Sequence, residues 1–117
     1  MIKREFTTKR LSNFVTFNGI AYISGQVPTT TELDIDKQTR EVLAKIDALL
    51  ESAGSCKENL LSAQVWIKDM AQDFSQFNAV WEEWIGDNEP PARAAVEANM
   101  ARPDVLVEVM VTAAQRF

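Results

Sequence analysis

Two charged residues lie inside segments whose patterns are otherwise typical of β-strands. In the segment 105–113, one face holds valines and an alanine, and the other face consists of Leu106, Glu108, Met110 and Thr112. A strand face that is open to water is mostly polar, so a lone carboxylate between Leu106 and Met110 indicates a face that packs on another subunit or lines a pocket. Because a buried carboxylate without a partner is costly or takes up a proton, Glu108 needs a hydrogen-bond donor.

Arg93 is the candidate donor, because it follows Pro90 and Pro91 near the start of a neighbouring predicted strand. An arginine can bind a carboxylate through two parallel hydrogen bonds. The carboxylate could be Glu108, in a structural ion pair between strands or subunits, or it could belong to a ligand. The pattern alone favours the ion pair, and it leaves open whether Arg93 and Glu108 share a face of the sheet.

Three further residues could contribute to a site. Asn78 borders the apolar stripe of a predicted helix, where it could fasten a strand backbone, line a cleft or, as is more common, simply flank the stripe. Ser24 and Gly25 end a predicted strand. Glycine lets backbone amides approach a ligand closely, and serine adds a hydroxyl group. Neither feature is specific by itself.

The composition excludes several classes of chemistry. The chain has no histidine and one cysteine, so it lacks the residues of a Ser-His-Asp or Cys-His arrangement and of an ordinary zinc site. That cysteine, Cys56, is interpreted as a turn residue. No acidic cluster has calcium-loop spacing and no glycine-rich phosphate loop is present, so neither a metal nor a cofactor is expected. The net charge of −5, without a visible basic patch, argues against a broad nucleic-acid surface.

Length and hydropathy indicate one globular domain spanning 1–117. Hydrophobic residues make up 46% of the chain and charged residues 25%, which is ordinary globular composition. No apolar run approaches the ~18 residues that span a membrane, so no membrane partner is expected. The charged residues of the first five positions are followed by no apolar stretch, and we therefore expect no secretory signal and a cytoplasmic location.

The strands that must position these residues are predicted from alternation, residue type and turn signals. Two segments, 61–68 and 105–113, alternate in side-chain character from one residue to the next. Four other segments are predicted to be strands from their residue types and the turns beside them: 2–7, 14–17, 20–24 and 92–98. Asn18-Gly19 between the second and third is a strong hairpin signal. A loop with Pro103 joins the last two, which we also expect to form a hairpin.

Two helices complete the predicted fold. Apolar residues at helical spacing predict an amphipathic helix at 36–53, which Asp34 or Asp36 can cap and Gly54 can end. Further along, Asp73-Phe74-Ser75-Gln76 resembles a capping box and is followed by a second apolar stripe. The order of elements predicts an α+β fold: one mixed sheet with both helices packed on one face.

Four segments together resemble the motifs of the RidA (YjgF) family of reactive enamine and imine deaminases. They occur in the family's order, at suitable spacing, and extend across the chain: Ser24-Gly25-Gln26-Val27-Pro28, Asn78-Ala79-Val80-Trp81, Pro91-Ala92-Arg93-Ala94-Ala95-Val96 and Val105-Leu106-Val107-Glu108-Val109. Each segment is weak alone, but the ordered set is specific. The resemblance implies a chorismate-mutase-like fold assembled as a homotrimer, with a barrel-like centre and clefts between subunits.

The resemblance also implies an activity and a set of site residues. Members of the family hydrolyse 2-imino acids or their enamine tautomers, such as 2-iminopropanoate and 2-iminobutanoate, to 2-keto acids and ammonia without a cofactor. Arg93 would hold the carboxylate of this small ligand, and Glu108 would orient or deprotonate the attacking water. The remaining residues would bind substrate or water, or support the cleft wall: Ser24, Gly25, Asn78 and Ala95.

This sequence also departs from the best-known deaminases. The segment Arg10-Leu11-Ser12-Asn13-Phe14 has no tyrosine where they carry one, and Ala95 stands where they carry a cysteine. These differences resemble a divergent branch of the family and leave substrate preference and turnover open. The alternatives are a trimer that binds small carboxylates without turnover, an endoribonuclease like some family members, and a purely structural or chaperone-like trimer. The net charge and the lack of histidine argue against the ribonuclease.

Overall fold

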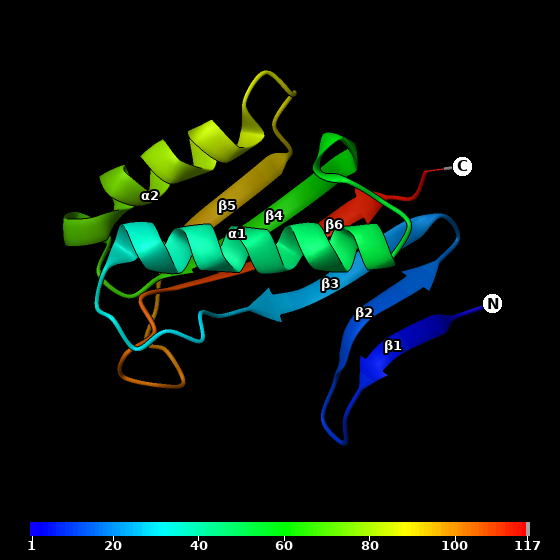
Figure 1. The fold of residues 1–117 in the computed structure, drawn as a ribbon, viewed down its shortest axis with the longest axis horizontal. Helices are drawn as coiled ribbons and strands as arrows, with labels where there is room; N and C mark the ends of the chain where they lie inside the picture. Colours follow the sequence, from blue (N-terminus) through cyan, green and yellow to red (C-terminus); the bar gives the residue numbers. More distant parts are fainter. Residues whose placement is uncertain (117) are drawn as a thin grey trace.

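Six strands form one mixed sheet in the order β1-β2-β3-β6-β4-β5 (Figure 1). The computed structural model describes residues 1–116. The strands are β1 (Lys3–Thr7), β2 (Ser12–Phe17), β3 (Ile20–Gln26), β4 (Leu60–Ile67), β5 (Ala92–Glu97) and β6 (Val107–Ala114). Neighbouring strands are antiparallel except β4 and β5, which run parallel. The predicted α+β class and the single mixed sheet are confirmed.

The turn between β2 and β3 has the backbone conformation that its sequence predicts. Asn18 and Gly19 both have positive φ angles, 51° and 79°. Asparagine and glycine tolerate this left-handed conformation, which matches the twist of the two flanking strands. The predicted hairpin is therefore confirmed.

Helix α1 (Ile35–Ser52) begins and ends within one residue of the predicted bounds. The Asp34 side chain accepts a hydrogen bond from the backbone N–H of Lys37 at 3.1 Å, which makes Asp34 the N-cap. Beyond the helix, Gly54 has a φ of +77°, the left-handed conformation that commonly ends helices. A short 3₁₀ helix, η1 (Lys57–Asn59), follows.

Helix α2 (Met70–Ile85) begins about one turn before the predicted capping box, so that prediction is wrong. Its N-cap is Asp69, which accepts from the backbone N–H of Gln72 at 3.1 Å. Asp73 lies inside the helix with 4% of its surface exposed, and burial raises the pKa of its carboxyl group.

Within residues 1–116, neither helix combines the length and apolar character that crossing a membrane requires.

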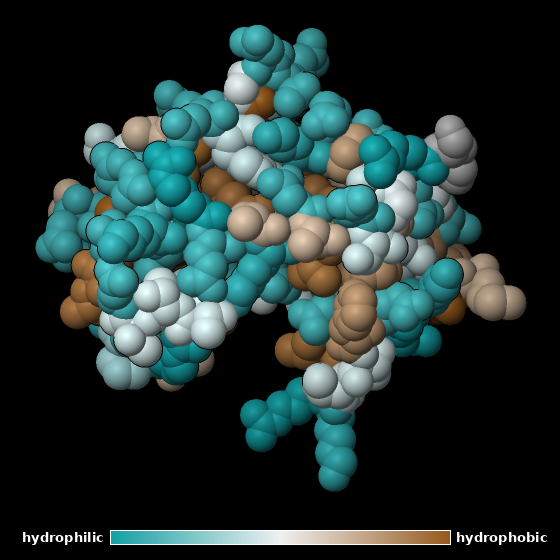
Figure 2. All heavy atoms as spheres, viewed as in Figure 1, coloured by the Kyte–Doolittle hydropathy of each residue, from teal (hydrophilic) through white to brown (hydrophobic). Residues whose placement is uncertain are grey.

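Both helices lie on the same face of the sheet, as predicted (Figure 1). α1 crosses β3 and β6, and α2 lies along β4 and β5. The core between them contains the fully buried side chains of α1, α2 and the central strands: Val42, Ile46, Leu50, Phe77, Val65, Ile67, Val107 and Val109. Seen from the helix side, the molecular surface is mainly hydrophilic (Figure 2).

The predicted hairpin between the last two strands is wrong. β5 pairs in parallel with β4, and β6 lies on the other side of β4 between β3 and β4. The unit β4-α2-β5 is a crossover connection, which returns the chain to the sheet in the same direction. This leaves β5 at the edge, while β6 takes the central position that suits its buried valine face.

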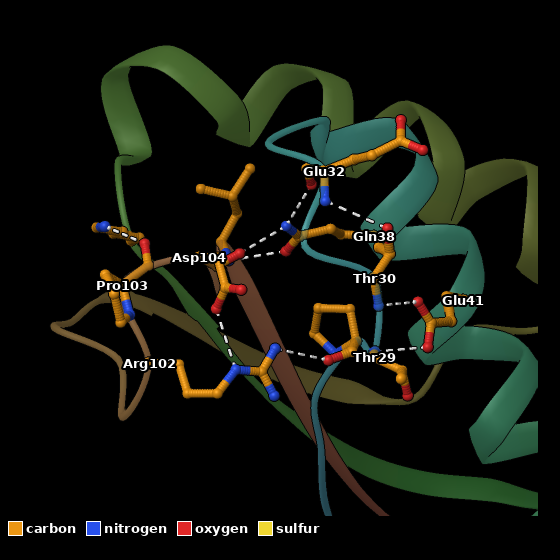
Figure 3. Close-up of polar contacts among 11 residues, drawn as sticks. Thr29, Thr30, Glu32, Gln38, Glu41, Arg102, Pro103 and Asp104 are labelled. Carbon is orange, nitrogen blue, oxygen red and sulfur yellow. Dashed lines mark hydrogen bonds and ion pairs between the residues drawn. The ribbon is translucent and has the colours of Figure 1, made fainter.

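The loops before α1 and before β6 are joined through Gln38, which is fully buried (Figure 3). Its side-chain amide donates to the backbone oxygens of Glu32 and Asp104 at 2.8 Å each. Its side-chain oxygen accepts from the backbone N–H of Leu106, also at 2.8 Å. One buried side chain therefore satisfies three backbone groups from two loops.

The loop before α1 is also held by Glu41 and Arg102 (Figure 3). The Glu41 carboxylate accepts from the backbone N–H groups of Thr29 and Thr30 at 2.6 and 3.1 Å. These bonds, that of Thr29 foremost, lower the pKa of Glu41 to about 2. Arg102 donates to the backbone oxygen of Pro28 at 3.0 Å.

Candidate functional site

Arg93 lies on the helix-covered face of the sheet, at the β5 edge. In the parallel pairing of β4 and β5, Arg93 is opposite Ala63, a buried residue of that face. Its guanidinium carbon lies 5.3 Å from the centroid of the Trp81 ring, 5.7 Å from Phe74 and 5.8 Å from Phe77. A cation within about 6 Å of an aromatic centroid is attracted by the electron-rich ring face. Three rings of α2 therefore flank one cation.

The three rings come together because of their spacing in α2. Residues 74, 77 and 81 follow the helical repeat, so their side chains share one stripe. The ring centroids of Phe74 and Phe77 are 6.4 Å apart, and those of Phe77 and Trp81 are 6.0 Å apart. These residues were predicted as part of the apolar stripe of the second helix, and their contact with Arg93 was not predicted. The signal was an aromatic stripe followed, after one loop, by a strand with an arginine near its start.

The Arg93 guanidinium has no acidic partner among residues 1–116. The ion pairs in this part of the chain are formed by other cations, and none includes Arg93. The Arg93 side chain is also exposed to solvent. Its hydrogen-bond donors are therefore free to bind an external anion, with the planar arrangement that suits a carboxylate.

Glu108 lies on the opposite face of the sheet, which no helix covers. It is opposite Trp66 of β4, while its neighbours Val107 and Val109 point into the core. Burial raises the pKa of the Glu108 carboxyl group. The sequence analysis predicted a hydrogen-bond donor for Glu108. Within residues 1–116, no side chain forms a hydrogen bond or ion pair with it.

Gly25 accommodates the Glu108 side chain. The pairing of β3 with β6 shifts register between Ile23 and Gln26, which places Ser24 and Gly25 at a bulge. A Cβ atom at position 25 would overlap with the Glu108 carboxylate, so the side chain lies directly against the glycine backbone. Gly25 was expected to let backbone amides approach a ligand, and in the structure its close neighbour is the Glu108 side chain.

Gln26 holds Ser24 in place beside this bulge. The Gln26 amide group donates to the Ser24 hydroxyl at 3.1 Å and to the Ser24 backbone oxygen at 3.0 Å. Gln26 itself is 9% exposed, so its position is fixed by packing. The motif Ser-Gly-Gln therefore forms one unit in which glutamine orients serine and glycine admits Glu108.

The predicted site residues thus form two groups on opposite faces. Gly25 lies against Glu108 on the uncovered face, and Ser24 precedes it in the same bulge. Ala95 shares the helix-covered face with Arg93, because it lies opposite Val65 and packs on the core. Asn78 is half-buried on α2, next to Phe77 of the aromatic stripe. An ion pair between Arg93 and Glu108 of the same chain is not formed, because β4 separates their strands and their side chains leave the sheet in opposite directions.

The uncovered face carries exposed hydrophobic side chains among polar ones and is hollowed beside β5. Tyr22, Met110 and Val96 remain 47%, 43% and 45% exposed. A cavity of about 340 Å³ lies over β4, β5 and β6, and small side chains such as Ser62 and Ala94 line it. Monomeric proteins rarely expose such a face, so its features suit contact with another chain.

Comparison with known proteins matches residues 2–115 to the family described as endoribonuclease L-PSP. A RutC family protein from Haemophilus ducreyi is 43% identical over 114 residues, which cover 97% of each chain. A crystal structure of a YjgF family member from Neisseria meningitidis has 40% identity and a TM-score of 0.95, covering 100% of this chain and 97% of that one. A Rid family protein of unknown function from Yersinia pestis has 35% identity and a TM-score of 0.86, covering 92% and 90%.

Proposed function

Because the chain belongs to the YjgF (RidA) family, we propose that it hydrolyses reactive 2-imino acids, or their enamine tautomers, to 2-keto acids and ammonia. The observation that carries the proposal is Arg93, a cation that rests on three aromatic rings and has no acidic partner in the described chain. Every 2-imino acid carries a carboxylate next to its reactive carbon. An arginine that binds this carboxylate through two hydrogen bonds fixes the position of the imine carbon.

Glu108 supplies the proton transfers in this proposal. The carbon of an imine that is protonated on its nitrogen is already electrophilic. Water adds to this carbon as Glu108 accepts one proton of the water. The proton then passes to the nitrogen of the tetrahedral intermediate, and the C–N electron pair leaves with ammonia. The remaining hydroxyl loses its proton as the C=O bond of the 2-keto acid forms. The raised pKa of Glu108 strengthens it as a base.

The two groups of site residues require an assembly, and we propose a homotrimer with the site in a cleft between subunits. Arg93 and Glu108 leave one sheet in opposite directions, so one chain cannot place both on a single small substrate. Arg93 lies at the β5 edge, where a neighbouring subunit can supply Glu108 and Gly25. The hollowed face that no helix covers supports this contact, because it offers exposed hydrophobic side chains to bury.

A trimer that binds small carboxylates without turnover is the second candidate. The observation that favours it is Ala95, which stands where the best-known deaminases carry a cysteine. Carboxylate binding needs Arg93 alone, whereas hydrolysis also needs Glu108 beside the imine carbon. The two candidates therefore differ in their dependence on Glu108.

The test follows the decay of 2-iminobutanoate, generated in solution by an amino-acid oxidase, with and without the purified full chain. We expect the wild-type chain to accelerate the decay. Arg93→Ala should lower kcat/KM by about 30-fold to 1000-fold, the equivalent of roughly 2–4 kcal/mol, because a charge-assisted contact is removed. Light scattering should report the same oligomer for both.

Arg40→Ala is the matched control. Arg40 is an exposed arginine of α1 that pairs with Asp36 at 2.7 Å, on the outer surface of the helix layer. Its loss should leave the rate unchanged. A wild-type chain that accelerates no imine would refute hydrolysis, and binding of 2-oxobutanoate in calorimetry would then favour the second candidate. An Arg93→Ala chain that dissociates would show that Arg93 is structural.

A further inference from the structure

We propose that Phe74, Phe77 and Trp81 of α2 are positioning residues, whose rings hold the Arg93 guanidinium in place for the substrate carboxylate. The inference rests on the proposed function and adds the residues that make Arg93 an effective carboxylate receptor. None of the three needs to touch the substrate, because they act through Arg93.

The three aromatic rings lie around one side of the Arg93 guanidinium. The guanidinium carbon lies 5.3–5.8 Å from all three centroids, within the range of a cation–π contact. Phe77 is fully buried and Trp81 is 5% exposed, so the rings themselves cannot move freely. A long arginine side chain that is otherwise exposed thereby loses part of its freedom before a ligand arrives. Less ordering is left for the binding step, which strengthens binding.

Aromatic neighbours leave the Arg93 hydrogen-bond donors free, whereas an acidic neighbour would occupy them. A neighbouring aspartate or glutamate would occupy the same donors that a substrate carboxylate needs and would cancel the charge. A ring face attracts the cation without accepting its in-plane hydrogen bonds as a carboxylate does. The rings also exclude water from one side of the guanidinium, and an ionic hydrogen bond is stronger where water is excluded.

A second cation–π contact on α2 shows the contrasting case. The Lys57 ammonium lies 5.5 Å from the centroid of the Trp84 ring, but it also donates to the Trp84 backbone oxygen at 2.7 Å. The Lys57 ammonium is therefore already bound to a backbone oxygen near the C-terminal end of α2. Arg93 has the rings and no acidic partner within the described part of the chain. The Trp84 ring also lies 5.4 Å from the Trp81 ring, so the control for stability is taken from the other helix, at the fully buried Leu50 of α1.

The experiment measures the Kd of 2-oxobutanoate by calorimetry, together with KM and kcat for 2-iminobutanoate. Phe74→Leu and Trp81→Leu should each raise Kd and KM roughly threefold to tenfold, because one ring of the support is lost. The kcat should change little, since the carboxylate is held equally in the ground and transition states. Trp81→Phe, which keeps a ring, should restore most of the affinity.

Leu50→Val should lower the melting temperature and leave Kd unchanged, which separates loss of stability from loss of positioning. In an Arg93→Ala background, Trp81→Leu should have no further effect on Kd. The positioning role is overturned if folded Phe74→Leu and Trp81→Leu chains bind 2-oxobutanoate as the wild type does. It is also overturned if Trp81→Leu weakens binding equally without Arg93. A wild-type chain that neither binds 2-oxobutanoate nor hydrolyses an imine would instead refute the proposed function, and the positioning role with it.

Discussion

Gly25→Ala is expected to displace the Glu108 carboxylate with little damage to the rest of the fold. The added Cβ would overlap with one carboxylate oxygen and would lie 3.1 Å from Cδ and 3.4 Å from Cγ of Glu108. The whole end of the side chain must therefore move. The φ angle of Gly25 is not in the left-handed region, unlike that of Gly54, so the alanine itself is not strained. The effect arises from the contact alone.

The magnitude follows from that contact. Turning a side chain about 30° away from its preferred rotamer costs roughly 0.5–1.5 kcal/mol, and we expect the free energy of unfolding to fall by about that amount. In the proposed mechanism, a displaced Glu108 no longer reaches the attacking water. Loss of a general base lowers kcat by about 100-fold or more. A small change in stability should therefore accompany a large change in rate.

The assay is a double-mutant cycle measured by urea denaturation. Gly25→Ala should destabilise the wild-type chain and should have almost no effect in a Glu108→Ala background, where the obstructing carboxylate is gone. Gly54→Ala is the control, because its cost comes from a φ of +77° and should be the same in both backgrounds. Equal destabilisation by Gly25→Ala in both backgrounds, or a wild-type rate for the single variant, would refute the reasoning.

Two other predictions concern the loops beside α1. Bonds from the backbone of Thr29 and Thr30 lower the Glu41 pKa to about 2, so ionised Glu41 stabilises the fold above its ordinary pKa of 4.5, and this contribution is lost as the pH falls from 4.5 towards 2. Glu41→Gln should therefore lower the free energy of unfolding by about 1 kcal/mol at pH 7 and by less at pH 3; an equal loss at both values would contradict it. Gln38→Leu should cost roughly 3 kcal/mol in urea denaturation, because three buried backbone groups lose their partner. The exposed neighbour Lys37, changed to alanine, should alter stability by less than about 0.5 kcal/mol, and a similar loss for both would count against the role of Gln38.

Local features of the sequence were sufficient for most elements. The bounds of α1 follow from its apolar period, Asp34 and Gly54, which act over a few residues. The β2–β3 hairpin follows from Asn18 and Gly19 for the same reason. The start of α2 was missed because Asp69 and Asp73 are both plausible N-caps. Only the packing of α2 placed Asp69 at the N-terminal start of the helix and Asp73 inside it.

Pairing between distant strands could not be read from the sequence. The segments 92–98 and 105–113 are adjacent in the chain, so a hairpin was expected, but β4 lies between them in the sheet. Strand pairing depends on contacts across the whole domain, and a shift of one residue reverses the face of every side chain. The relation between Arg93 and Glu108 was therefore undetermined until the register was known.

The sequence by itself determined which residues are candidates for a site: an arginine near a strand start, a carboxylate on an apolar strand face and a Ser-Gly strand end. The tertiary structure decided how they are grouped. It placed Glu108 against Gly25, placed Arg93 on the aromatic stripe of α2 and put the two on opposite faces. The physical reason is that residue type and local period are fixed by neighbours in the chain, whereas register and crossover are fixed by burial of the whole sheet.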